Sequence, residues 1–156
     1  MNSQINHTFH DHILLQNCHT AVFVTPGFEP QSSVSPSLPK IVSTTLSPHD
    51  NGVMQIARVL AYCPQVPTVY IHANGEPGQL ILGNVHLTVD TIDQYAWDIQ
   101  SWFGAIPSFV QPSLVLNGCK VGDGEKGNAL IHRLRYLTGS HITCQQSSAQ
   151  RHLQLV

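Results

Sequence analysis

Charged side chains are scarce in this sequence, and neither sign dominates. Lys and Arg number 7 against 9 Asp and Glu, and the formal net charge of the 156 residues is -2. Binding to nucleic acid or to an anionic membrane needs a basic surface, so this balance predicts neither partner. Hydrophobic residues reach 42%, which indicates a globular chain with an apolar core.

Long apolar runs and targeting signals are also lacking. No segment stays apolar over the ~20 residues that a membrane-spanning helix needs. The first twenty residues, MNSQINHTFHDHILLQNCHT, have no basic start followed by an apolar stretch. We therefore expect a cytoplasmic protein, with export by a route without an N-terminal signal left open. The length predicts one domain, residues 19–156, behind a polar, His-rich tail, residues 1–18.

Cysteine pairs with metal-ligand spacing are missing as well. The four cysteines are Cys18, Cys63, Cys119 and Cys144. None of them forms a C-x-x-C pair, so we expect mostly thiols in a reducing compartment. His7, His10 and His12 cluster in the tail, where a solvated segment explains them as well as a metal site does. No metal and no cofactor is predicted.

What the chain does have is short apolar strands that alternate with amphipathic helices. The predicted strands are residues 20–25, 40–46, 68–73, 113–118, 141–145 and 152–156. QLILGNVHLT (79–88) predicts a small hairpin that turns at Gly83-Asn84. Alternation of this kind predicts an α/β sandwich with a mostly parallel central sheet and helices on both faces.

Three helices are predicted between these strands. The first is capped by Ser47 or Asp50, and the second covers about residues 89–106 and is capped by Thr88. The third covers about residues 125–138 and ends at Gly139. Trp97 and Trp102 lie in the second helix, where packing in the core and at its rim is the favoured interpretation.

The carboxyl ends of the third and fourth strands are the favoured place for a site. Sites of parallel sheets form beyond these ends. His72 and Asn74-Gly75 follow one strand, and Gly118-Cys119 follows the other. An exposed cysteine with a lowered pKa and a base nearby is a nucleophile, whereas most other cysteines are small buried hydrophobes. Cys119 is the best candidate, with both interpretations open.

The loop GDGEKG (122–127) offers a different interpretation. Its glycines spell G-x-G-x-x-G between a strand and a helix, the pattern of a dinucleotide-binding turn. Three residues separate the strand from the first glycine, and the next strand ends in Gln145-Gln146, with no carboxylate to bind a ribose. Nucleotide binding is therefore only a second alternative.

Several segments in order resemble a known family. They are YIHANGEPGQLILGN, LTVDTIDQYAWDIQSW, LVLNGCKVGDGEKGNALIHRL and LTGSHITC. The chain from about residue 19 to 156 is similar to a bacterial domain family of unknown function, usually found at the front of large secreted adhesin-like repeat proteins. That family is grouped with the caspase–gingipain clan of cysteine peptidases. The resemblance implies a caspase-like three-layer α/β sandwich.

Position by position, the resemblance places the presumed nucleophile on Cys119, after Gly118. The turn glycines fall on Gly75 and Gly78. The family's presumed catalytic His falls on Asn74, and the Tyr before its Gly-Cys pair falls on residue 117, an Asn here. Asn has no titratable group near neutral pH, so it cannot act as a base.

The resemblance thus implies a catalytically impaired pseudo-peptidase that binds a protein or peptide. The alternative is an active cysteine endopeptidase in which His72 is a relocated base. His72 lies two residues before Asn74 on the same face of the strand, hence about 6–7 Å away along it. We expect that His72 and Cys119 do not meet.

Overall fold

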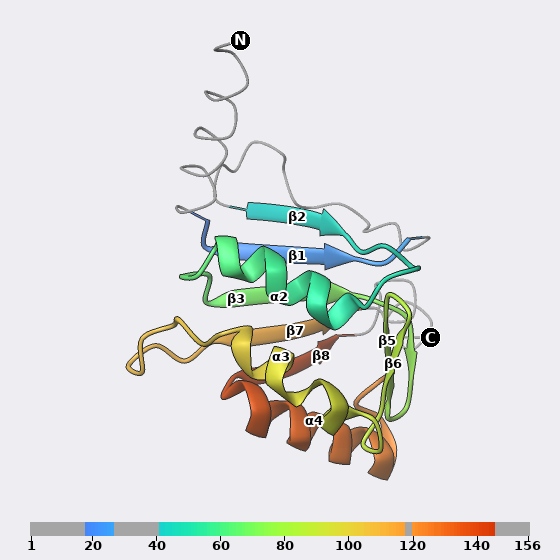
Figure 1. Cartoon of the computed structure of the whole chain (residues 1–156). Coiled ribbons are helices and arrows are strands. Elements are labelled where there is room, and N and C mark those ends of the chain that lie inside the picture. The colour runs from blue at the N-terminus through green and yellow to red at the C-terminus, as the bar shows by residue number, and fades with distance from the viewer. Residues whose placement is uncertain (1–17, 27–40, 118–119, 146–156) are drawn as a thin grey trace, which may run out of the picture.

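The chain is built around a five-stranded, fully parallel sheet in the order β2-β1-β3-β7-β8 (Figure 1). The computed structural model describes residues 18–26, 41–117 and 120–145. The strands are β1 (Thr20–Val24), β2 (Ile41–Thr45), β3 (Thr68–His72), β7 (Ser113–Asn117) and β8 (His141–Gln145). The predicted parallel sheet is confirmed, with β3 and β7 as neighbours. The predicted strand 152–156 lies outside the described residues.

The described helices all lie on one face of this sheet (Figure 1). They are α2 (Gly52–Tyr62), the 3-10 helix η1 (Ile92–Tyr95), α3 (Ala96–Ser101) and α4 (Gly124–Thr138). The steps from β2 to β3, β3 to β7 and β7 to β8 run in one direction across the sheet, and right-handed crossovers then share one face. The expectation of helices on both faces is therefore not met among the described residues.

The predicted helix ends are right for α4 and wrong for α2. Gly139 ends α4 in the left-handed conformation, with φ 65°. The N-cap of α2 is Asn51, whose Oδ1 accepts a hydrogen bond from Met54 N at 3.0 Å. Ser47, expected to cap the helix, instead donates its backbone N–H to Gln55 Oε1 at 2.7 Å. None of these helices is long and apolar enough to cross a bilayer.

The second predicted helix, about residues 89–106, is shorter in the structure, where the helical turns cover only η1 and α3. Thr88 and Thr91 bond reciprocally, since each backbone N–H donates to the other's hydroxyl, and the helical turns begin only at η1. Trp102 is buried and donates Nε1–H to Val53 O at 3.2 Å. Trp97 is 85% exposed, so the packing expected for it is wrong. It faces solvent because α3 buries only Ile99.

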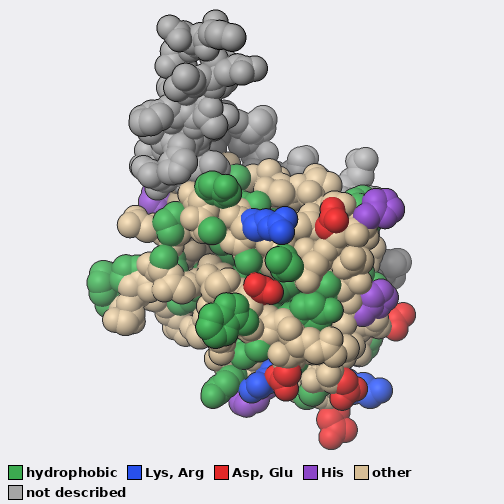
Figure 2. Space-filling model, in the orientation of Figure 1, with side chains coloured by type: hydrophobic (Ala, Val, Ile, Leu, Met, Phe, Trp, Pro, Cys, Tyr) green, Lys and Arg blue, Asp and Glu red, His purple; other side chains and the backbone are tan. Residues whose placement is uncertain are grey.

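Ion pairing contributes little to the contact between the helices. Arg133 on α4 pairs with Asp93 of η1 at 2.7 Å, and its guanidinium lies 5.2 Å from the ring centre of Tyr136. All three side chains face solvent to a large extent, so the ion pair contributes about 0–1 kcal/mol. Acidic and basic side chains are mixed along this lower edge of the molecule (Figure 2). The apolar core, rather than charge, therefore holds the helices to the sheet.

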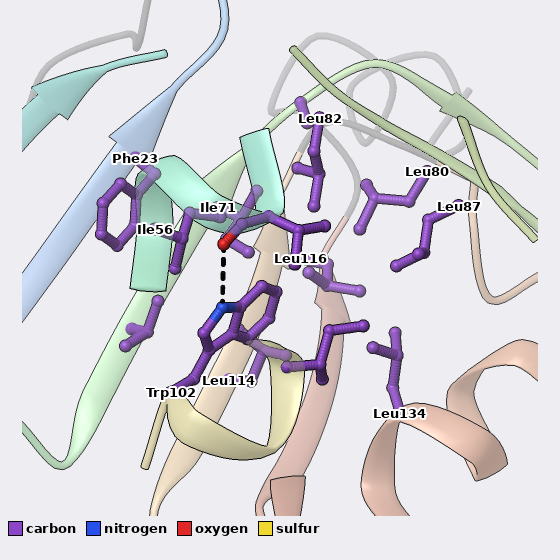
Figure 3. Close-up of a cluster of buried hydrophobic side chains, with 14 of the residues drawn as sticks. Phe23, Ile56, Ile71, Leu80, Leu82, Leu87, Trp102, Leu114, Leu116 and Leu134 are labelled. Atoms are coloured by element: carbon purple, nitrogen blue, oxygen red, sulfur yellow. Dashed lines mark hydrogen bonds between the residues drawn. The ribbon is translucent and has the colours of Figure 1, made fainter. Parts of the chain in front are cut away.

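A small antiparallel sheet closes the carboxyl end of the core. It consists of β4 (Gly75–Glu76), β5 (Gln79–Leu82) and β6 (Val85–Leu87). β5 and β6 form the predicted hairpin, and Gly83 in its turn has φ 61°. Leu80, Leu82 and Leu87 point from this sheet toward Leu116 (Figure 3). They are at most 1% exposed, so the small sheet seals the helical side of the core.

The glycines of the GDGEKG loop bring the start of α4 against the loop that precedes it. A Cβ on Gly127 would lie 2.3 Å from the backbone carbon of Gly122, so the two backbones touch. Gly124, with φ 71°, has nothing within 4 Å of such a Cβ. The first and third glycines of the motif therefore serve packing, and the second serves the turn into the helix.

We predict that Gly127→Ala lowers the free energy of unfolding by about 1–2 kcal/mol. The backbone clash costs up to about 3 kcal/mol, whereas alanine gains about 1 kcal/mol over glycine in a helix. Urea unfolding followed by circular dichroism measures the change. Asn128→Ala, an exposed position one residue along, should be neutral or slightly stabilising. Equal stability of the two variants would show that the loop and α4 are not in close contact.

Candidate functional site

The carboxyl ends of β3 and β7 bring His72 and Asn117 together. The two residues are register partners in adjacent parallel strands. His72 Nε2 lies 3.5 Å from Asn117 Nδ2, and both side chains are partly buried. The third and fourth predicted strands therefore meet at the edge where the sequence places the candidate site.

Both side chains point away from the helices. Ile71 and Leu116, one residue earlier in each strand, are fully buried in the core under the helices. Successive side chains of a strand point to opposite faces. His72 and Asn117 therefore lie on the other face, while the small sheet fills the helical side of this edge with leucines (Figure 3). A ligand that contacts this pair must approach from the face opposite the helices.

The backbone around His72 is held firmly in place. Its carbonyl oxygen accepts hydrogen bonds from Thr25 N at 2.9 Å and from Thr25 Oγ1 at 3.2 Å. Ala73 N donates to Asn117 O at 3.4 Å, so the strand pairing continues one residue past β3. The imidazole is thus carried by a rigid strand end, which suits a binding group that must keep its direction.

Burial determines the protonation state of His72. Desolvation lowers the pKa of His72 below its ordinary value, so the imidazole is neutral at pH 7. The Asn117 amide then donates from Nδ2 toward Nε2, which places the ring proton on Nδ1. Asn117 Oδ1 is buried and has no hydrogen-bond partner within the described part of the chain. It is a buried acceptor that a further N–H donor would satisfy.

Asn74, the position that the resemblance assigns to the base, is exposed. It lies between β3 and β4, and its carbonyl oxygen accepts from Ile81 N at 3.1 Å. Gly75 belongs to β4, and Gly78 has φ 78° and donates its N–H to Val121 O at 2.9 Å. These contacts attach the turn to the loop before α4. Both glycines therefore have structural roles in this turn.

Gly118 and Cys119 lie outside the described residues. Asn117 before them and Lys120 after them are described, and Lys120 is exposed. The sequence therefore places Cys119 two residues beyond the Asn117 amide and one residue before an exposed lysine. The expectation that His72 and Cys119 do not meet therefore stays a prediction.

A second thiol lies near this edge and was not among the sequence-based candidates. Cys144 on β8 is exposed and is the register partner of Leu116. The residue is exposed overall, but its sulfur lies against Gly122 and is partly desolvated, and this desolvation is the main cause that raises its pKa. A hydrogen bond from Gly122 N–H lowers the pKa, and the Asp123 carboxylate raises it. A thiol with a raised pKa is a poor nucleophile at neutral pH. The sequence could have pointed to Cys144 only through its place near the carboxyl end of the predicted parallel strand 141–145.

The start of α4 is unsuited to a phosphate. A helix N-terminus attracts anions through its unpaired N–H groups. Here Asp123 is the N-cap residue and Glu125 lies in the first turn, and both are exposed. Their carboxylates occupy the positive end of the helix dipole and repel a nucleotide phosphate. The geometry of the loop therefore favours packing over nucleotide binding.

A scan against protein families matches residues 22–150 to the domain of unknown function DUF4347. The chain belongs to the DUF4347 family. Neither curated proteins nor solved structures give a significant match. In this DUF4347 domain the matched residues include β2, β3, β7 and β8, the part of β1 from residue 22 onward, and both strand ends that form the candidate site.

We predict that the DUF4347 domain loses stability as the pH falls below about 6.5, in part because of His72. A histidine whose pKa is lowered by folding stabilises the protein above its unfolded pKa, and this contribution is lost as the pH falls through the folded pKa. Urea unfolding between pH 7.5 and 5 measures the slope. A proton NMR titration should place the midpoint of His72 below that of an exposed histidine.

The matched comparison uses two single variants. His72→Asn should flatten the dependence of stability on pH, whereas His132→Asn, on the exposed side of α4, should leave it unchanged. An unaltered slope in His72→Asn would mean that this imidazole is solvated and titrates normally.

Proposed function

We propose that this domain is a caspase-like, catalytically impaired relative of the cysteine peptidases that binds a peptide or protein segment at the carboxyl edge of β3 and β7. The coarse architecture, a parallel sheet with helices and a small antiparallel sheet, agrees with that assignment. The proposal rests on what the residues of this edge can and cannot do chemically.

The first support is the residue at the base position. The resemblance places the family's histidine on Asn74, whose amide neither accepts nor releases a proton near neutral pH. Its side chain is exposed and its backbone is fixed by the hydrogen bond from Ile81. A cysteine next to such a group gains no general base there, and general-base assistance is typically worth about a hundred- to ten-thousand-fold in rate.

The second support, and the observation that carries the proposal, is the unpaired acceptor Asn117 Oδ1. A buried amide oxygen without a partner costs about 1–3 kcal/mol. A peptide backbone supplies N–H donors at regular spacing, so a bound segment that reaches this oxygen removes the cost. The edge is thus better suited to hydrogen bonding than to proton transfer.

One observation favours the alternative of an active cysteine endopeptidase. His72 is held neutral by burial and is therefore able to accept a proton at pH 7. It pairs with Asn117, and the sequence places Cys119 only two residues farther on. In this alternative His72 takes the proton of Cys119, and the exposed Asn74 has no catalytic role. The two functions therefore differ in which residue controls the reactivity of Cys119.

We predict that Cys119 of the native protein behaves as an ordinary thiol toward iodoacetamide and that no peptide library is cleaved. Asn74→His should increase the alkylation rate of Cys119 at neutral pH, because an imidazole returns to the base position of the family. Peptide mapping by mass spectrometry separates alkylation at Cys119 from alkylation at Cys144.

Two control variants complete this experiment. Asn128→His adds an imidazole on the exposed side of α4 and should not change the rate at Cys119. His72→Ala should also leave it unchanged. Fast alkylation of Cys119 in the native protein that is lost in His72→Ala would reject the pseudo-peptidase and establish His72 as the base.

We further predict that random peptides displayed on phage yield binders to the native domain and that Asn117→Leu weakens them about 2- to 10-fold, the loss of one hydrogen bond. Leucine keeps the size of the side chain and removes its acceptor. The matched control is Tyr136→Ala, which should leave the affinity unchanged. Tyr136 lies on α4, away from this edge, and is 73% exposed. Binders that tolerate Asn117→Leu, or a selection that yields none, would contradict peptide binding at this edge.

A further inference from the structure

Two buried thiols lie at the opposite, amino-terminal edge of the main sheet. Cys18 comes two residues before β1, and Cys63 is the C-cap residue of α2. Cys18 is 7% exposed and Cys63 is 2% exposed, and both belong to one core cluster. Neither takes part in the candidate site, which lies at the far ends of the strands.

The register of the sheet places the two cysteines near the starts of two adjacent strands. Thr20 and Thr68, the first residues of β1 and β3, are partners in adjacent parallel strands. Cys18 stands two residues before Thr20, and Val66 stands two residues before Thr68. The N–H of Val66 donates to Cys63 O at 3.2 Å, so the end of α2 folds back against the start of β3. Cys18 and Cys63 therefore flank the same pair of strand starts.

The electrostatics of Cys63 agree with this proximity. Burial raises its pKa to about 11, and the neighbouring Cys18 sulfur raises it further as a second cause. Burial also raises the pKa of Cys18. Both groups are thus protonated at neutral pH and react slowly. The electrostatic effect of Cys18 on the pKa of Cys63 requires that the two sulfurs be close in space.

We propose that Cys18 and Cys63 form an intramolecular disulfide when the protein meets a disulfide oxidant such as oxidised glutathione. One thiol loses its proton and attacks the glutathione disulfide, which releases one reduced glutathione and leaves a mixed disulfide. The second thiol then loses its proton and attacks the protein sulfur of that mixed disulfide, which releases the second glutathione. The two cysteines lose two electrons and two protons, and the oxidant is reduced to two thiols.

This bond joins Cys18, just before β1, to the end of α2 and encloses β1, β2 and α2 in one covalent loop. A cross-link of two residues so far apart in sequence removes conformational freedom from the unfolded chain. The oxidised domain is therefore more resistant to unfolding, without any change at the edge where His72 lies. Cys144 lies on the last strand, three strands away from β1 and toward the carboxyl edge, and is outside the reach of either thiol.

The test uses the native protein and oxidised glutathione in mildly alkaline buffer. Acid quenching, alkylation and proteolysis precede mass spectrometry. We expect a linked pair of peptides that contain Cys18 and Cys63, lighter by two hydrogen atoms than their sum, and a melting temperature several degrees higher that returns to its starting value with dithiothreitol. Cys144→Ser should retain the link, and Cys63→Ser should replace it by a glutathione adduct on Cys18.

The mapping in the native protein decides the outcome even if a variant does not fold. Glutathione adducts on single cysteines without a link between Cys18 and Cys63 would overturn the proposal. The same holds for a link that forms only in urea, and for links that join either residue to Cys119 or Cys144.

Discussion

The parallel register between β3 and β7 is the constraint on which the site and the core both depend. It places Ile71 beside Leu116 on the helical face and His72 beside Asn117 on the other. A shift of either strand by one residue would move its apolar side chain to the other face and its polar side chain into the helical core, because the side chains of a strand alternate with a period of two. The same pairing that buries the core therefore also determines which groups a ligand meets.

Burial on the helical face makes this register costly to change. Ile71, Leu114 and Leu116 are fully buried, and each such side chain stabilises the fold by about 1.5–3 kcal/mol. The ion pair between Asp93 and Arg133 is exposed and contributes little by comparison. The polar edge can thus carry an unsatisfied amide oxygen because a large apolar core holds its two strands in place.

Close backbone contacts at glycines attach the small sheet to the elements around the main sheet. A Cβ on Gly83 would lie 2.1 Å from Asp50 O, and one on Gly52 would lie 2.4 Å from the backbone of Leu82. Gly78 bonds to Val121 at the other end. The small sheet is therefore attached both to the start of α2 and to the loop before α4. These two attachments fix the segment that carries Asn74.

Periodicity and turn chemistry made most of the described fold predictable. Gly139 and the Gly83-Asn84 turn follow from local backbone preferences, and the strands follow from short β-branched runs. The N-cap at Asn51 was missed because Ser47, Asp50 and Asn51 can each cap a helix. The hydrogen bonds that decide, from Ser47 N to Gln55 Oε1 and from Met54 N to Asn51 Oδ1, are visible only in the structure. Trp97 was misjudged because a helix with a small apolar face leaves little room for a second tryptophan in the core.

The site was predictable in its position but not in its chemistry. The order of elements predicted β3 and β7 as parallel neighbours, and the structure confirms that their carboxyl ends lie side by side. The unpaired oxygen of Asn117 depends on which groups surround one amide, and no sequence pattern carries that information. Under the proposed function, the polar groups of this edge, with one unpaired amide oxygen on Asn117, would bind a ligand through hydrogen bonds and not through charge. The proposal of binding without turnover therefore depends on Asn74, the residue that stands where the resemblance places a titratable base.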